Sequence, residues 1–135
     1  MKKILNFLAT DGAFVFEEHD CRLVDSEYIP AFGGTGSITL RNEFIALRFC
    51  LDRDRLTMEV KAANDVSPYS WFSLDIIRQV LTGEIVPTTT LTSDNVVFIR
   101  SNFLKIQDLF KQGCRFDTEK RCREFEAQRS KRLFG

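Results

Sequence analysis

Apolar and polar side chains alternate along three consecutive stretches, residues 37–40, 44–51 and 56–61. Because successive side chains of a strand point to opposite faces, the apolar positions of each stretch share one face. Polar turns at residues 42–43 and 52–55 join the stretches and are too short for a parallel crossover. The pattern predicts an antiparallel meander with one buried face, formed by Ile38, Leu40, Ile45, Leu47, Phe49, Leu51, Leu56, Met58 and Val60.

Before this meander the pattern predicts one short helix and two extended segments. Ile4, Phe7 and Leu8 share one face of a helix over residues 3–10, which Asp11-Gly12 ends. Residues 14–16 and 21–29 are predicted to be extended.

Three helices are predicted after the meander. The first has Ser73 as its N-cap, runs to about Leu81 and ends at Gly83. The second opens at Ser93 or Asp94 and runs to residue 112, and the third is a charged helix from residue 117 or 118 to about residue 133. The predicted fold is therefore α+β: a single domain over residues 1–135, with an antiparallel β-meander packed on one face by C-terminal helices and a short N-terminal helix.

Composition strengthens the expectation of a large core. The chain has 135 residues, enough for one domain, and its 13 phenylalanines are roughly twice the number expected for an average protein of this length. Phe has no polar group, so most of these rings should be buried. In particular, Leu47, Phe49, Met58 and Val60 are expected to face the helix that contains Phe103 and Phe110.

The net charge is zero, but its distribution is uneven. Residues 1–99 hold 9 basic and 14 acidic side chains, whereas residues 100–135 hold 10 basic and 5 acidic ones. An acidic patch near the N-terminus would steer a basic partner, and rigid amphipathic rings near loops are typical of binding hot spots. The predicted partner-binding residues are Glu17, Glu18, Asp20, Asp25, Glu27, Tyr28, Tyr69 and Trp71.

Catalytic and metal chemistry have weak support in the sequence. Gly33-Gly34-Thr35-Gly36 runs into a strand and lacks the Lys of a phosphate loop, which favours a turn or bulge. The metal-capable side chains of residues 17–21 are adjacent and would point to opposite faces of an extended chain. A role for His19 and a carboxylate in general acid–base catalysis is an alternative that the sequence leaves open, although no pattern marks a nucleophile beside His19. We therefore predict no metal, no cofactor and no enzymatic activity.

The cysteines and the chain ends complete the sequence-based picture. Cys21, Cys50, Cys114 and Cys122 form no C-x-x-C pair, and free thiols are predicted. The apolar run at residues 4–9 is too short for a signal peptide, so a cytoplasmic protein with no membrane partner is expected. The basic residues after Lys120 alternate with glutamates, which favours a solvated helix over a nucleic-acid surface.

Several short motifs carry a family resemblance. They are Tyr28-Ile29-Pro30-Ala31-Phe32-Gly33-Gly34, Leu47-Arg48-Phe49 with Asp52-Arg53, Trp71-Phe72-Ser73-Leu74-Asp75 and the ending Lys131-Arg132-Leu133-Phe134. Together they resemble small bacterial α+β proteins, among them immunity proteins that accompany contact-dependent growth inhibition and other polymorphic toxins. The resemblance covers residues 28–83 and the chain end, and its motifs are structural.

The resemblance implies tight cytoplasmic binding of one cognate toxin domain, by blocking its active site or an adjoining surface. The leading hypothesis is an immunity protein that neutralises a toxin domain, a nuclease in the favoured version. The alternative is a nucleic-acid-associated module that uses the basic C-terminal helix. A small enzyme and a structural or regulatory subunit are further alternatives, and the oligomeric state stays open.

Overall fold

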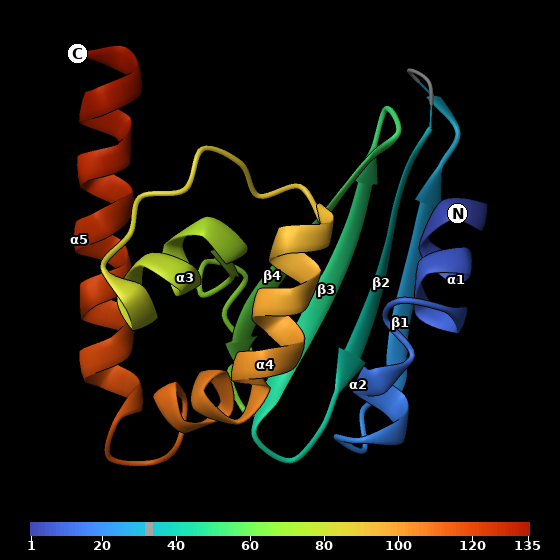
Figure 1. Ribbon diagram of the computed structural model, residues 1–135, viewed down its shortest axis with the longest axis horizontal. Helices are drawn as coiled ribbons and strands as arrows, with labels where there is room; N and C mark the ends of the chain where they lie inside the picture. Colours follow the sequence, from blue (N-terminus) through green and yellow to red (C-terminus); the bar gives the residue numbers. More distant parts are fainter. Residues whose placement is uncertain (32–33) are drawn as a thin grey trace.

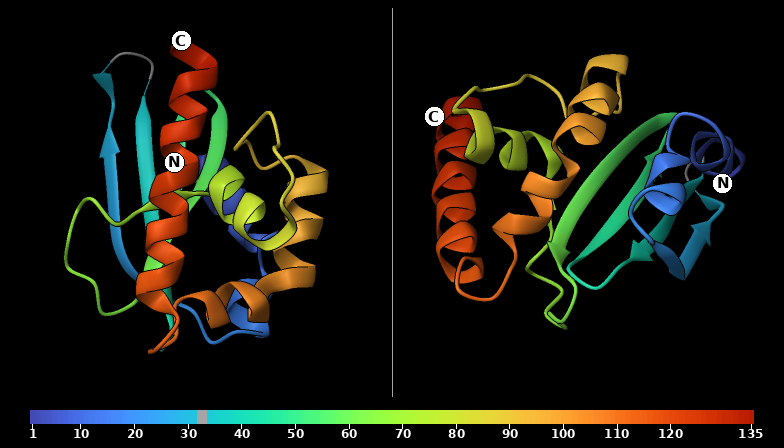
Figure 2. Two further views of the ribbon diagram at one scale, coloured as in Figure 1. Left: turned by 90° about the vertical axis from the view of Figure 1, so that its left-hand side faces the viewer. Right: turned by 60° about the horizontal axis from the view of Figure 1, so that its bottom comes forward.

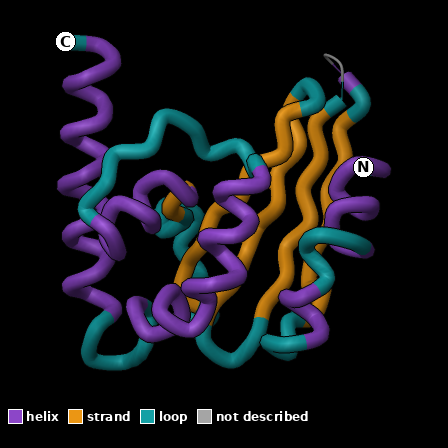
Figure 3. Tube along the Cα trace, in the orientation of Figure 1, coloured by secondary structure: helices purple, strands orange, loops and turns teal. Residues whose placement is uncertain are grey.

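The centre of the computed structural model is a five-stranded antiparallel sheet whose strands follow one another in chain order (Figure 1). The structure describes residues 1–31 and 34–135. The tube in Figure 3 shows the longer strands lying side by side. The predicted meander is confirmed as β2 (Thr35–Arg41), β3 (Ile45–Asp52) and β4 (Arg55–Ala62). The sheet is completed by β1 (Arg22–Ile29), which was predicted to be extended, and by β5 (Phe72–Ser73), which was not predicted.

Alternation along β2, β3 and β4 divides the sheet into a buried face and an open face. Phe49 lies opposite Ile38 on one side and Met58 on the other, and all three are at most 2% exposed. The intervening polar residues are mostly half-exposed. Leu51 departs from the predicted pattern because it lies at the end of the sheet, where it is only half-buried and packs at the margin of the core.

Five helices accompany the sheet in the described residues: α1 (Lys2–Ala9), α2 (Phe14–Glu17), α3 (Leu74–Thr82), α4 (Ser93–Leu109) and α5 (Arg115–Phe134). In Figure 1, α1, α2 and α4 lie in front of the sheet, whereas α5 stands beyond β4 and packs against α3. The core forms between the sheet and these helices. Phe7 of α1 lies 5.6 Å from Phe49, measured between ring centroids, and Phe103 and Phe110 of the α4 region join the same cluster, as predicted.

The structure corrects the prediction for residues 14–16. They form part of α2 instead of an extended segment. Phe14 and Val15 are both buried, and one turn of helix brings two adjacent side chains into the core, whereas a strand would point them to opposite faces. The ring of Phe14 packs edge-on against Phe103 at a centroid distance of 6.3 Å.

The ends of the later helices also differ from prediction. Gly83 ends α3 in a left-handed conformation (φ 78°), as expected, but α4 ends at Leu109 and is kinked at Asn102. Helix α5 begins at Arg115, before either predicted cap. The hydroxyl of Thr118 donates to the Leu109 carbonyl at 2.6 Å, so it joins α5 to α4 instead of capping α5.

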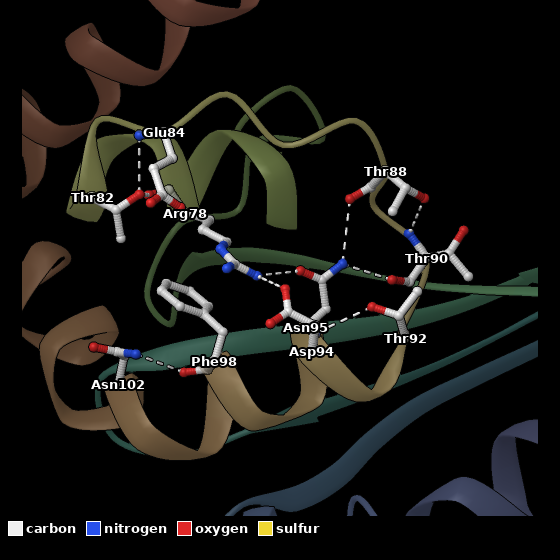
Figure 4. Close-up of polar contacts among 10 residues, drawn as sticks. All are labelled: Arg78, Thr82, Glu84, Thr88, Thr90, Thr92, Asp94, Asn95, Phe98 and Asn102. Atoms are coloured by element: carbon white, nitrogen blue, oxygen red, sulfur yellow. Dashed lines mark hydrogen bonds and ion pairs between the residues drawn. The ribbon is translucent and has the colours of Figure 1, made fainter.

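A buried polar cluster holds the loop that leads into α4 (Figure 4). Asn95 is 2% exposed, and its side-chain amide donates to the carbonyls of Thr90 (2.7 Å) and Thr88 (3.3 Å). Its side-chain oxygen accepts from Arg78 of α3 at 2.9 Å. Because all these groups are satisfied by one side chain, Asn95 fixes α3, the loop and α4 relative to one another.

The glycine-rich segment lies between β1 and β2. Gly34 has φ 85°, a backbone conformation that favours glycine, and β2 begins directly after it. Phe32 and Gly33 lie outside the described residues. Among the helices of the described chain, none combines the length and the apolar character needed to cross a bilayer.

Candidate protein-binding surface

The open face of the sheet carries polar side chains over strands β1 to β4. The loop over residues 63–71 rises on this side, away from the helices (Figure 2, left). Sheet and loop enclose a shallow depression with a volume of about 570 Å³. The side chains that shape it are Asp25, Glu27, Arg41, Arg48, Lys61, Asp65, Val66 and Trp71.

Trp71 is held at the side of this depression by two cations. The guanidinium of Arg48 lies 4.5 Å from the centre of the indole, and the Lys61 ammonium lies 4.8 Å from it. Arg48 is itself fixed, because its Nε and Nη2 both donate to Oε1 of Glu59, at 2.9 and 2.7 Å. Cations over an indole face stabilise the arrangement, so Trp71 is a positioned aromatic surface.

The loop that borders the depression is anchored by Asp65. Its side chain is 9% exposed, accepts the Ser67 backbone N–H at 2.7 Å and pairs with Arg115 of α5 at 2.9 Å. Burial raises the pKa of this carboxyl, but hydrogen bonds from Ser70 and Ser67 and the charge of Arg115 outweigh burial and lower it. Two neighbours, Val66 and Tyr69, are 96% and 87% exposed. An anchored loop therefore presents uncovered apolar and aromatic side chains.

The predicted binding residues divide between two sides of the molecule. Asp25, Glu27 and Trp71 line the depression, and Tyr69 lies on the loop beside it. Tyr28 follows Glu27 on β1 and so points to the other side of the sheet. Its hydroxyl lies so close to Gly34 that the Cβ of any larger residue at position 34 would be 3.2 Å from it.

The remaining predicted carboxylates surround α2. Glu18 pairs with Arg100 of α4 at 3.0 Å, and Glu17 lines a separate hollow of about 390 Å³ between α1, α2 and α4. Asp20 follows in the connection to β1, with φ 55°. The acidic sequence segment thus forms two patches, of which only the one on β1 reaches the depression.

The uneven charge of the sequence becomes a separation in space. The acidic segment lies at the β1 end of the molecule, and the basic helix α5 lies at the opposite end (Figure 1; Figure 2, right). Several α5 cations are engaged within the molecule: Arg115 with Asp65, Arg129 with Asp75, Arg121 with the Val80 carbonyl and Arg123 over the Phe72 ring. These contacts reduce the positive charge that α5 offers to a partner.

The groups with potential chemical reactivity lie in apolar or paired surroundings. His19 stacks on Phe103 with ring centroids 3.8 Å apart, and burial lowers the pKa of its imidazole. Cys50 lies on the open face, where burial, followed by the nearby Glu59 carboxylate, raises the pKa of its thiol to about 11. Within residues 1–31 and 34–135, no three His, Cys, Asp or Glu side chains gather as a metal site would require.

The sequence signals the Trp71 site only in part. Arg48, Glu59 and Lys61 all fall on the polar side of the alternating pattern, which is a signal that they share a face. By contrast, Asp65 and Arg115 are fifty positions apart in the sequence and no local pattern connects them.

The described residues define an α+β protein with one open, hollowed sheet face. Comparison of the chain with protein-family models, with curated proteins and with solved structures finds no match. The open face, with its depression and the exposed Val66 and Tyr69 beside it, is the feature of the described residues that bears on function.

Proposed function

We propose that this chain is a bacterial immunity protein, which binds a cognate toxin domain in the cytoplasm and neutralises it by occupying its surface. The observation that carries the proposal is the open sheet face, where a depression of about 570 Å³ adjoins an anchored loop with exposed Val66 and Tyr69. The resemblance of residues 28–83 to immunity proteins supports the same assignment. Inhibition by surface contact requires shape and charge, and no chemistry from the inhibitor.

The proposed partner is a basic domain, a nuclease. Nucleases must attract phosphate, and carboxylates such as Asp25 and Glu27 compete for the same positive field. Tyr69 and Trp71 provide rigid rings whose burial stabilises a complex at small cost in conformational entropy. In this arrangement the charges accelerate association, and the aromatic side chains slow dissociation.

A toxin-like domain encoded beside the gene for this chain is the first expectation of the proposal, and the test is co-expression of the chain with that domain. We expect growth to be restored and a stable complex to form between the purified proteins. Tyr69→Ala should weaken the complex by about 2 kcal/mol, mainly through faster dissociation. Phe116→Ala is the matched control, because Phe116 is an 80% exposed ring on α5 that lies outside the depression.

Charge-reversal variants show which of the two acidic patches contacts the partner. The pair Asp25→Lys and Glu27→Lys should slow association and flatten its salt dependence, whereas reversal at Glu17 and Glu18 reports on the α2 patch. Loss of binding only in the second pair would move the interface to α2. Absence of both binding and protection in the wild-type protein would overturn the proposal.

The second candidate is a nucleic-acid-associated module. It is favoured by the exposed cations of α5 that have no ion pair, hydrogen bond or ring contact within the described residues: Lys120, Lys131 and Arg132. Retention on DNA or RNA that falls steeply with salt, and that is lost when these three residues are replaced by Gln, would support this function over toxin binding.

A further inference from the structure

Within residues 1–31 and 34–135, the edge strand β1 has a strand partner on only one side of its backbone. It is the outermost strand of the sheet order, and all eight of its residues are exposed. The opposite edge is covered, because β4 pairs with β5, bridges Thr90 through Thr57 and accepts the Leu91 N–H at the Leu56 carbonyl (2.8 Å). An uncovered edge of this length is a template for an additional strand.

The register shows which amides of β1 face outward. The Asn42 N–H donates to the Ile45 carbonyl across the β2–β3 turn, so the backbone groups of β2 at even positions point to β3. The odd positions of β2 then pair with Asp25, Glu27 and Ile29 of β1. The backbone groups of Ser26 and Tyr28 point away from the sheet. Consistent with this direction, the Ser26 N–H donates to the Asp25 carboxylate at 2.9 Å and to no other strand in the part of the chain that the structure describes.

The side chains of β1 oppose pairing with a second copy. Asp25 and Glu27 face the open side, opposite Thr39 and Ser37 of β2. When two copies of β1 pair antiparallel around Asp25, Ser26 or Glu27, these registers place Asp25 opposite Asp25, Asp25 opposite Glu27, or Glu27 opposite Glu27. Like charges directly across a strand pair are destabilising. The backbone of β1 can therefore hydrogen-bond to another strand, but its carboxylates disfavour a strand that carries acidic residues opposite them.

We propose that β1 accepts an added strand from a protein partner, and that this strand alternates basic and apolar residues. The basic side chains would lie across from Asp25 and Glu27 on the open face. The apolar ones would lie on the other side, beside Leu23 and Tyr28, which are 56% and 55% exposed. The proposal rests on the proposed function only in that the partner is a protein, and it specifies the segment that β1 binds.

Capped eight-residue peptides test the proposal with the full chain. One peptide alternates Lys and Val, and its counterpart alternates Glu and Val. In NMR titrations we expect the Lys–Val peptide to shift the amide signals of Ser26 and Tyr28 and to bind at least about tenfold more tightly than the Glu–Val peptide. The double reversal Asp25→Lys with Glu27→Lys should invert this preference.

A proline variant separates strand addition from simple charge attraction. Ser26→Pro removes an outward N–H and leaves the β1–β2 hydrogen bonds in place. Edge strands tolerate proline at a position such as Ser26, where the N–H points away from the sheet. It should abolish peptide binding, while Ser26→Ala, which keeps the N–H, should preserve it. Folding of Ser26→Pro is checked by its unfolding midpoint, and an N-methyl group at alternate peptide amides provides the same test in the wild-type protein.

Self-association gives a second, peptide-free measurement. The single reversal Asp25→Lys places opposite charges across from each other twice in the register centred on Ser26, so this variant should dimerise in sedimentation experiments while the wild type stays monomeric. A wild-type dimer that pairs through β1 would overturn the charge argument, as would a monomeric Asp25→Lys variant.

The peptide results are decisive in either direction. The proposal is overturned if neither peptide binds at millimolar concentration, if both bind equally, or if Ser26→Pro binds as the wild type does. Failure of the proposed function looks different, because a candidate toxin domain would then be missing from the gene neighbourhood or fail to bind, while the Lys–Val peptide still binds.

Discussion

Replacing Asp65 is expected to destabilise the protein and to loosen the loop beside the depression. The Asp65 carboxylate is 9% exposed and bonds to the Ser67 N–H at 2.7 Å and to Arg115 at 2.9 Å. Asp65→Ala removes both contacts and the hydrogen bond from Ser70, and it leaves Glu119 as the one carboxylate that pairs with Arg115 in the described residues, with its nearest oxygen 3.5 Å from Nε. The loop then loses its attachment to α5.

The magnitude follows from the charged hydrogen bonds that are lost. Hydrogen bonds to charged groups contribute roughly 1.5–3 kcal/mol each. Because the Arg115 side chain is 27% exposed, water recovers part of the second one, and the expected loss for Asp65→Ala is about 2–4 kcal/mol. Asp65→Asn keeps an acceptor for Ser67 and loses only the ion pair, so about half of that loss is expected.

Urea unfolding measures both effects. At neutral pH the urea midpoint should be highest for the wild type, lower for Asp65→Asn and lowest for Asp65→Ala. The control is Asp94→Asn, since the Asp94 side chain is 78% exposed and its ion pair with Arg78 should contribute within about 0.5 kcal/mol. Hydrogen exchange should become faster over residues 64–70 in Asp65→Ala and stay unchanged in the control.

The pH dependence supplies the refutation. The folded-state pKa of Asp65 lies below its unfolded value of 3.8, so the stability that this carboxylate contributes is present above about pH 4 and is lost as the pH falls through the folded pKa. The gap between wild type and Asp65→Asn should therefore narrow in acid. An Asp65→Ala midpoint equal to that of the wild type would show that the anchor contributes nothing, and a gap between wild type and Asp65→Asn that stays constant at low pH would show that the charge of the carboxylate does not carry its contribution.

The other predictions concern the core and the titrating groups. Phe49→Ala and Phe103→Ala should each lower the free energy of unfolding by about 3–5 kcal/mol, because both rings are at most 2% exposed; unchanged urea midpoints would contradict the face assignment. Among the thiols, the exposed Cys114 should react before Cys122, whose pKa is raised to about 12 by burial, and mass spectrometry of the labelled sites would show the reverse order if this is wrong. Burial lowers the pKa of His19 below 6.5, so stability present above that pH should decline as the pH drops towards the folded pKa. A His19→Gln variant should show a flatter profile between about pH 7 and 5, and equal slopes would argue against a half-buried, neutral imidazole at His19.

The alternation of residues 37–61 was sufficient to predict the three central strands, β2 to β4, but not β5. A period of two determines which side chains share a face, and turns of a few residues permit only antiparallel neighbours. Gly83 likewise marks the end of α3, because the left-handed conformation there favours glycine. For the candidate site, the same parity places Asp25 and Glu27 on one face of β1 and Tyr28 on the other.

What each face meets was decided by the tertiary structure. Phe14 and Val15 form a helical turn because the core accepts both side chains, a demand that outweighs the extended pattern of their short segment. The separation of Glu18 from Glu27 follows from the packing of α2 beside α4, where Arg100 pairs with Glu18. Periodicity reports the direction of a side chain relative to its own element, whereas the contacts of Asp65 with Arg115 and the uncovered edge of β1 depend on how distant elements pack.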